Sequence, residues 1–166
     1  LWHYHQTRKN PRRFELTHPF YGLGFSDEEI SRALAGAGLV SEKLEEPELL
    51  ARTARALADG KIVGWFQGRF EMGPRALGNR SILADPRPAD MRTVINSKIK
   101  HRESFRPFAP AVLEERAHEY FDIAQADPFM TLAPRVHAHR AREIAAAVHI
   151  DGTARIQTVS RTANQR

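Results

Sequence analysis

The chain has 166 residues, a net charge of +5 and no cysteine. This length suits one domain and suffices to bury about two-thirds of the surface that the unfolded chain exposes. The composition, 42% hydrophobic and 27% charged, excludes a disordered tail. The lack of cysteine excludes disulfides, thiolate nucleophiles and cysteine-ligated metals, and it fits a cytoplasmic protein. No apolar run approaches ~18–20 residues, so we expect no membrane span.

The positive charge is concentrated in one stretch. Residues 69–106 contain nine basic and four acidic side chains, which accounts for the whole net charge of +5. The remaining basic and acidic residues cancel. A local excess of this kind indicates a candidate site for an anionic partner.

The N-terminal third predicts an arm followed by two helices. Residues 1–25 have no hydrophobic period and no initiator Met or signal-peptide core, so we expect an arm of a longer chain that packs on another surface, or pairs two copies into a homodimer. Ser26 and Glu29 form a capping-box pattern that predicts a helix over 26–37, which Gly38 ends. Pro47 and an apolar stripe predict a second helix over 46–59.

The rest of the chain is expected to alternate between strands and helices. A short apolar run at 61–67 predicts a buried strand. Hydrophobic spacing predicts further helices at 88–100 and 114–121. Extended segments are expected at 80–84, 106–113, 129–132, 145–150 and 154–159, the last two joined in a hairpin at Asp151-Gly152. This alternation predicts an α/β or α+β sheet domain.

The segment 67–81 combines glycines with arginines. Glycine lets the backbone approach a ligand closely or adopt a positive φ, and arginine presents a planar fork of donors to a phosphate or carboxylate. The residues are Gly68, Gly73, Gly78, Arg69, Arg75 and Arg80. A structural turn with solvated arginines is an equally weighted alternative. The spacing matches neither a P-loop nor a dinucleotide fingerprint.

A second basic cluster lies in residues 96–108. Four cations there fall at even spacing and would share one face of an extended segment, although a solvated basic edge is the alternative. They are Lys98, Lys100, Arg102 and Arg106. Phe105 and Phe108 are expected to pack in the core rather than to stack on a base.

A third candidate is Arg155, between Ala154 and Ile156. A guanidinium in an apolar strand needs a partner if it is buried, either a phosphate or a carboxylate of the protein. Asp151 and Thr153, just before it, are consistent with a simple turn. The histidine pairs at 3/5 and 137/139 lack a clear third ligand, so no metal site is predicted.

Taken together, these blocks resemble the signature of the carbamoyltransferase family, which includes the nodulation protein NodU and antibiotic O-carbamoyltransferases. The blocks are Gly64-Trp65-Phe66-Gln67-Gly68-Arg69, Gly73-Pro74-Arg75-Ala76-Leu77-Gly78-Asn79-Arg80-Ser81, Lys100-His101-Arg102-Glu103, Phe105-Arg106-Pro107-Phe108 and His149-Ile150-Asp151-Gly152-Thr153-Ala154-Arg155. They occur in the family's order, and the resemblance covers about residues 20–160.

The resemblance implies the C-terminal, YrdC-like domain of that family, with a twisted open mixed α/β sheet and flanking helices. It implies that residues 26–160 form this domain, that 1–25 link it to a separate N-terminal transferase domain, and that 161–166 form a tail. Such domains bind ATP, with Mg²⁺, and carbamoyl phosphate, form carbamoyl-adenylate and release pyrophosphate. The N-terminal domain then transfers the carbamoyl group to a hydroxyl acceptor.

The resemblance also implies site residues, carried over motif by motif. The catalytic positions are Arg75, Lys100, Arg106 and Arg155. The further substrate-binding positions are Arg69, Arg80, Ser81, Arg102, Asp151 and Thr153. Two other functions remain as alternatives, a non-catalytic remnant that binds anions or a partner, and an RNA- or tRNA-binding YrdC-like domain. Against nucleic acid, the sequence has no ladder of interleaved aromatics and its excess charge is confined to 69–106.

Overall fold

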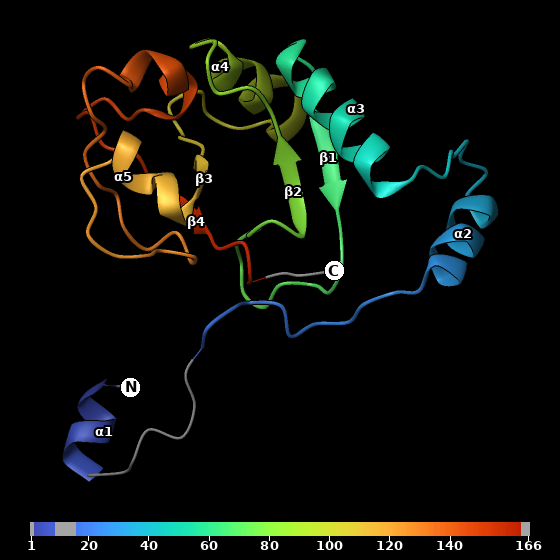
Figure 1. The fold of residues 1–166 in the computed structure, drawn as a ribbon, viewed down its shortest axis with the longest axis horizontal. Coiled ribbons are helices and arrows are strands. Elements are labelled where there is room, and N and C mark those ends of the chain that lie inside the picture. Colours follow the sequence, from blue (N-terminus) through green and yellow to red (C-terminus); the bar gives the residue numbers. More distant parts are fainter. Residues whose placement is uncertain (1, 9–15, 164–166) are drawn as a thin grey trace.

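The computed structural model describes residues 2–8 and 16–163 of the chain. In Figure 1 the sheets, α3, α4 and α5 form the body, while α1 and α2 lie apart from it. The elements in chain order are α1 (Trp2–Arg8), α2 (Asp27–Gly36), α3 (Glu46–Ala58), β1 (Val63–Phe66), β2 (Arg80–Leu83), α4 (Met91–Ile95), the π-helix η1 (Asn96–Lys100), β3 (Ala111–Leu113), the 3₁₀ helix η2 (Glu114–Arg116), α5 (Ala117–Tyr120), the 3₁₀ helix η3 (Ala141–Ala147) and β4 (Gln157–Val159).

The predicted α/β class is confirmed, but the single open sheet is not what forms. The strands in the described part of the chain make two separate two-stranded sheets. β1 and β2 are antiparallel, with Val63 opposite Leu83 and Phe66 opposite Arg80. β3 and β4 are parallel, with Ala111 opposite Gln157. Between the two sheets the chain passes through the turn at 84–90, α4 and η1 before it reaches β3.

The two predicted N-terminal helices are confirmed, including their ends. The Ser26 hydroxyl accepts a hydrogen bond from the Glu29 N–H at 3.2 Å, and the Glu29 carboxylate accepts one from the Ser26 N–H at 2.8 Å. These bonds satisfy two amide groups that the first turn of a helix leaves unpaired. Gly38 follows the end of α2 with a φ of 65°.

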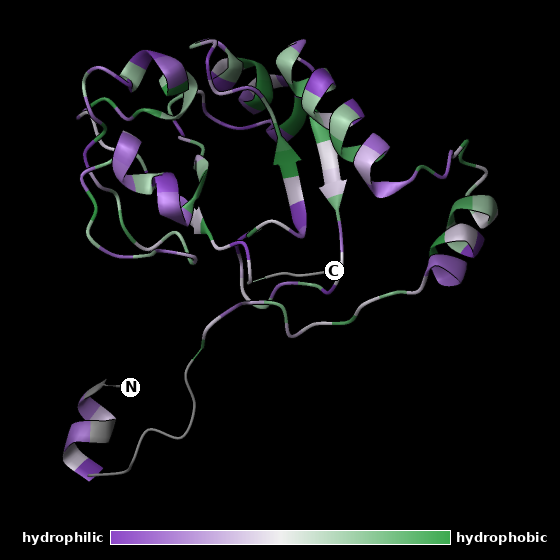
Figure 2. Ribbon diagram, viewed as in Figure 1, coloured by the Kyte–Doolittle hydropathy of each residue, from purple (hydrophilic) through white to green (hydrophobic). Residues whose placement is uncertain are grey.

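Neither α2 nor α3 contains a buried residue. Ile30 in α2 is 41% exposed and Leu50 in α3 is 50% exposed. Figure 2 shows apolar and polar residues on both helices, and Figure 1 shows α3 beside β1 and α2 away from the sheets. α3 therefore covers the β1–β2 sheet, whereas α2 contributes little to the core.

Several expectations for the second half of the chain are wrong. Residues 145–147 belong to η3, and only 157–159 of the expected hairpin form a strand. The turn itself forms, because the His149 N–H donates to the Thr153 carbonyl at 2.8 Å and Gly152 takes a φ of 80°. After this turn the chain runs into β4, which pairs with β3 and whose Gln157 N–H donates to the Pro110 carbonyl, so a distant strand replaces the local partner.

Two other extended segments are also absent. The expected strand at 129–132 is a turn, because the Asp127 carboxylate accepts hydrogen bonds from the Thr131 and Leu132 N–H groups. Residues 96–100 are helical, so the four cations of 98–106 do not alternate along one extended strand. At the N-terminus, 2–8 form α1 where an irregular segment is expected, and 9–15 lie outside the described residues.

The core consists of two clusters joined by η3. Phe121, Ala154 and Ile156 pack with Ile144 of η3 in the first. In the second, Ala146 of η3 packs against the buried residues of α4. η3 is kinked at Ile144, where φ is −134°, and residues at and after this kink link the two clusters.

Of the two phenylalanines in the basic stretch, Phe108 packs against the core and Phe105 lies on the surface. Phe108 packs against the second cluster, as expected. Phe105 is 77% exposed, so the expectation that it is buried is wrong. Asn96 Nδ2 donates to the carbonyls of the residues on both sides of Phe105. In the loop held in this way, the Phe105 side chain lies outside the core.

No helix in the described ranges is long and apolar enough to cross a membrane.

Candidate functional site

The loop between β1 and β2 is built around one buried carboxylate, Glu71. Its Oε1 accepts hydrogen bonds from the N–H groups of Leu77, Asn79 and Arg80 at 2.9, 2.8 and 3.1 Å. Its Oε2 accepts a hydrogen bond from Arg80 Nε at 2.7 Å. A carboxylate inside the loop therefore fixes the backbone that follows Gly73.

The environment of Glu71 keeps it ionised. Burial alone raises the pKa of this carboxyl, but the hydrogen bonds from Arg80, Leu77 and Asn79 outweigh burial and hold the pKa below its usual range. The Glu71 side chain is 0% exposed and that of Arg80 is 35% exposed. Arg80 is therefore neutralised by the protein itself.

The same loop is held against β4 and against the N-terminal segment. Gln157 Nε2 donates to the Leu77 carbonyl at 2.7 Å, which brings together residues 80 positions apart. On the other side, the Gly22 N–H donates to the Phe70 carbonyl at 2.9 Å. The Arg69 guanidinium reaches the Gly22 carbonyl at 2.8 Å. The loop is thus fixed from both ends of the chain before any ligand binds.

A second buried amide, Asn96, organises the basic segment after η1. Its side chain is fully buried, and its Oδ1 accepts a hydrogen bond from Arg102 Nε at 2.7 Å. Its Nδ2 donates to the carbonyls of Ser104 and Arg106 at 3.3 and 3.0 Å. The Arg102 guanidinium also lies 4.8 Å above the ring centre of Phe108. Arg102 is therefore fixed in position by neutral groups.

Two arginines from these segments, Arg75 and Arg102, lie near enough to Arg155 for their charges to act on it. Burial lowers the pKa of the Arg155 guanidinium, and the positive charges of Arg75 and Arg102 lower it further. The Nε of Arg155 is buried and has no hydrogen-bond partner in the part of the chain that the structure describes. Arg75 comes from the glycine loop, Arg102 from the segment after η1, and Arg155 from the segment before β4. We call these three residues the arginine cluster.

The arginine cluster has the properties of an anion-binding site. A buried polar group without a hydrogen bond costs free energy, and so do neighbouring cations that no carboxylate among the described residues neutralises. A phosphate or carboxylate of a ligand would remove both costs, since it accepts hydrogen bonds and supplies negative charge. The cluster joins two of the residues expected to be catalytic with one expected to bind substrate.

The other expected catalytic residues have different surroundings. Lys100 is exposed at the end of η1. Arg106 has a side chain 54% exposed, and its nearest acidic partner is Glu103, with 3.9 Å between nitrogen and oxygen. Among the interactions of the described residues, none joins Lys100 or Arg106 to Arg155.

The remaining expected residues make contacts within the protein. Arg69 and Arg80 bind the Gly22 carbonyl and Glu71, as described above. Ser81 lies in β2 opposite Trp65. The Asp151 carboxylate accepts hydrogen bonds from the Thr153 N–H at 3.0 Å and from its hydroxyl at 2.7 Å.

Sequence reasoning missed the residues that position the cluster, which are Glu71, Asn96 and Gln157. Glu71 left one signal, since it is the lone acidic residue between Arg69 and Arg80. Asn96 and Gln157 left none, because a neutral amide has the same appearance in a sequence whether it is buried or exposed. In the described residues, no three His, Asp or Glu side chains are grouped closely enough to hold a metal ion.

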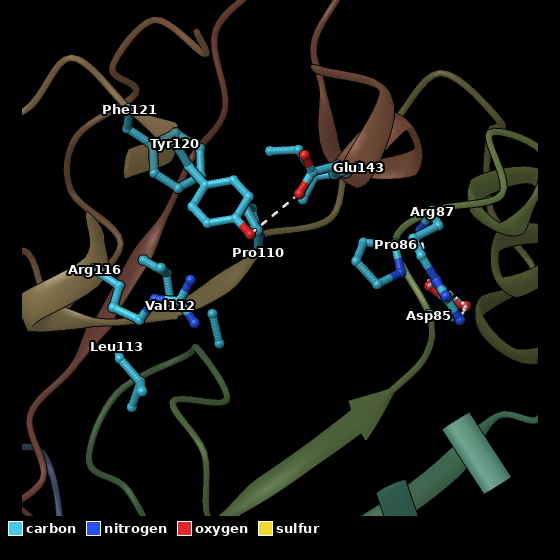
Figure 3. Close-up of a pocket in the computed structure, with 12 residues that line it drawn as sticks. Asp85, Pro86, Arg87, Pro110, Val112, Leu113, Arg116, Tyr120, Phe121 and Glu143 are labelled. Carbon is cyan, nitrogen blue, oxygen red and sulfur yellow. Dashed lines mark hydrogen bonds and ion pairs between the residues drawn. The ribbon is translucent and has the colours of Figure 1, made fainter. Parts of the chain in front are cut away.

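A separate cavity of about 420 Å³ lies between β3, α5 and η3 (Figure 3). Phe121 contributes to its apolar wall, and Tyr120 donates a hydrogen bond to Glu143 across it at 3.3 Å. Its Arg87 is already paired with Asp85 at 2.6 Å. None of the ten residues expected in the site lines this cavity.

Comparison with known proteins identifies the family. Residues 54–166 match the family described as carbamoyltransferase C-terminus. The chain is 46% identical to the nodulation protein NolNO of Sinorhizobium fredii over 156 residues, which cover 83% of this chain and 23% of that protein. It is 51% identical to the nodulation protein NolO of Bradyrhizobium diazoefficiens over 120 residues, covering 70% and 22% of the two chains. It is 46% identical to nodulation protein U of the same organism over 115 residues, covering 69% and 20%.

The chain therefore belongs to the carbamoyltransferase C-terminus family. It spans only 20–23% of the length of these three relatives. The family match includes all three residues of the arginine cluster.

Proposed function

We propose that this chain is the C-terminal domain of an O-carbamoyltransferase that binds ATP and carbamoyl phosphate and forms carbamoyl-adenylate. A separate N-terminal domain would then transfer the carbamoyl group to a hydroxyl acceptor. The family membership supports the reaction class, and the arginine cluster supports the type of substrate. Both substrates carry phosphate groups, for which guanidinium groups are suited donors.

The proposal depends on the surroundings of Arg155, whose Nε is buried without a partner among the described residues and whose charged neighbours are the cations Arg75 and Arg102. Formation of an adenylate brings two polyanions together, and fixed positive charge offsets their repulsion. The cluster provides this charge from segments that hydrogen bonds of Glu71 and Asn96 already hold in place. Little reorganisation would then be needed when the substrates bind.

Each residue of the cluster has a distinct part in the proposal. Arg155 would contribute the buried Nε, which needs an acceptor oxygen. Arg102 would donate from its remaining N–H groups while Asn96 holds its Nε. Arg75 would bring charge from the glycine loop, and Lys100 and Arg106 would extend the positive field from the neighbouring segment. Mg²⁺ would arrive bound to the ATP phosphates, whose charge it neutralises.

The chemistry also requires a defined stoichiometry. An oxygen of the carbamate group joins the α-phosphorus of ATP, and the bond from that phosphorus to pyrophosphate breaks. The carbamate comes from carbamoyl phosphate, which one water molecule cleaves to carbamate and inorganic phosphate. Assays for pyrophosphate and for inorganic phosphate thus report on different bonds.

The proposal is tested by replacing Arg155 with methionine and titrating carbamoyl phosphate and ATP into the 166-residue chain by calorimetry. We expect Arg155→Met to weaken binding by roughly 2–5 kcal/mol, because it removes a desolvated charge from a charged contact. Arg52→Met is the control, since Arg52 of α3 is exposed and forms an ion pair with Glu42, which precedes that helix. Equal binding by wild type and Arg155→Met would contradict the proposal.

Carbamoyl-phosphate-dependent exchange of pyrophosphate into ATP then separates catalysis from binding. Exchange by the wild-type chain supports formation of the adenylate. Binding of both ligands without exchange would instead support the alternative of a non-catalytic anion-binding domain.

A further inference from the structure

Phe105 is an exposed aromatic residue in a strongly basic segment. Its side chain is 77% exposed, whereas nearby Phe108 packs in the core. Within 96–106 the large exposed apolar side chains are Ile99 and Phe105. The same stretch carries four cations, so it has no extended apolar patch of the kind that marks a protein-docking surface.

The loop that carries Phe105 is tied to the arginine cluster through one side chain. Asn96 Nδ2 donates to the carbonyls of Ser104 and Arg106, which are the residues on either side of Phe105. The other end of the same amide accepts a hydrogen bond from Arg102 Nε at 2.7 Å. The backbone at Phe105 and the guanidinium of Arg102 are thus held on opposite ends of a single buried amide.

We propose that Phe105 stacks on the base of the nucleotide whose phosphates bind the arginine cluster. This inference rests on the proposed function, which provides the nucleotide. An exposed ring beside fixed cations matches a ligand with a planar heterocycle at one end and phosphates at the other, as in single-stranded nucleic acid sites that combine stacking with positive charge. The ring is exposed without the ligand because its partner surface belongs to the ligand.

The geometry also predicts what Phe105 does not do. It makes no contribution to phosphate binding, because it carries no donor and its loop is held by Asn96 rather than by the phenyl ring. It contributes little to folding, since most of its surface stays in water. Loss of the ring therefore affects ligands that have a base and spares those that have phosphates alone.

The test compares ATP with inorganic tripolyphosphate on the 166-residue chain, by calorimetry, for wild type, Phe105→Ala and Phe105→Trp. We expect Phe105→Ala to weaken ATP binding roughly 5- to 100-fold and to leave tripolyphosphate binding unchanged. Phe105→Trp retains ATP binding, and its added indole fluorescence is quenched by ATP but not by tripolyphosphate. Val40→Ala is the control, because Val40 is fully exposed in the segment between α2 and α3.

The outcomes distinguish the two proposals. If Phe105→Ala binds ATP as tightly as wild type while tripolyphosphate also binds, the stacking role is wrong and the phosphate site stands. An equal loss for both ligands also contradicts stacking, since it indicates a disturbed phosphate site. If the wild-type chain binds neither ligand, the proposed function fails, and the stacking role fails with it. Thermal unfolding of Phe105→Ala close to wild type confirms that the variant is folded.

Discussion

Arg80 and Arg155 both belong to basic segments of the sequence, yet their surroundings are opposite. Arg80 donates to the buried carboxylate of Glu71, so its charge is neutralised inside the fold. Arg155 has a buried Nε without a partner and two cations as charged neighbours. The first arrangement stabilises a loop, and the second leaves a positive charge that no ion pair among the described residues neutralises. An arginine is thus assigned to structure or to binding by its partner, not by its motif.

Glu71→Ala tests the structural role of the Arg80–Glu71 pair and has the largest expected effect. Removing this carboxylate leaves three backbone N–H groups and the Nε of Arg80 without their acceptor, while Arg80 keeps its bond to the carbonyl of residue 71. We expect a loss of about 3–5 kcal/mol in the free energy of unfolding, as for other broken buried charge networks. Urea denaturation measures this loss. Glu42→Ala removes an exposed carboxylate and should cost less than about 1 kcal/mol.

Substituting the two arginines themselves separates their roles. We expect Arg80→Met to lower the free energy of unfolding by about 2–3 kcal/mol, because it leaves a buried carboxylate short of one donor. Arg155→Met should leave stability unchanged or raise it, because it removes a desolvated cation that two other cations repel. Urea denaturation of both variants under identical conditions provides the comparison. A larger loss for Arg155→Met than for Arg80→Met would reverse the assignment.

The position of the glycine loop can be disturbed without changing any charge. A Cβ at position 22 would lie 2.6 Å from the Phe70 Cβ and 2.9 Å from its carbonyl oxygen. We therefore expect Gly22→Ala to cost about 1–3 kcal/mol of stability and to weaken phosphate binding through the displaced loop.

Gly36→Ala is the matched control for this change. Gly36 lies in α2 with nothing within 4 Å of an added Cβ. This substitution should raise stability by about 0.4–1 kcal/mol, because alanine favours a helix. Thermal unfolding of both variants, with calorimetric phosphate titration, checks the pair, and equal effects would mean that the contact with Phe70 is unimportant.

The dependence of the unfolding free energy on pH under acidic conditions provides a further test. The pKa of Glu71 is lower in the folded than in the unfolded chain, because its hydrogen bonds outweigh burial. Its contribution is therefore fully present above the unfolded pKa of about 4.3 and is lost as the pH falls through the lower folded pKa. Below about pH 4, wild-type stability should fall more steeply than that of Glu71→Gln. Parallel curves of unfolding free energy against pH would show that other carboxylates dominate.

The smallest effect is expected at Arg87. It pairs with Asp85 at 2.6 Å, but its side chain is 61% exposed. We expect Arg87→Ala to cost about 0.2–1 kcal/mol, since solvent screens the exposed guanidinium and the backbone N–H of residue 87 still donates to the buried Asp85 carboxylate. Phosphate binding should be unchanged, because Arg87 lies outside the arginine cluster. The same denaturation and calorimetry series includes this variant.

Local signals in the sequence were sufficient for much of the first half of the chain. The capping box of Ser26 and Glu29, the stop at Gly38 and Pro47 at the start of α3 all act within a few residues. The sequence also predicted the two strands on either side of the glycine-containing loop, whereas their antiparallel pairing came from the structure. In the second half the same reasoning failed at 145–159, where the Asp151-Gly152 turn formed without its hairpin. The dipeptide specifies a turn, whereas the partner of a strand is chosen by packing of the whole domain.

The sequence by itself determined the family, the helix ends and the presence of a glycine-rich basic loop, because these depend on residue type and short spacing. The tertiary structure decided which cations meet. Arg75 and Arg155 are 80 residues apart, and they converge because Gln157 binds the Leu77 carbonyl and because η3 joins the two core clusters. Whether a guanidinium faces a carboxylate or other cations depends on such long-range contacts, and no local pattern encodes them.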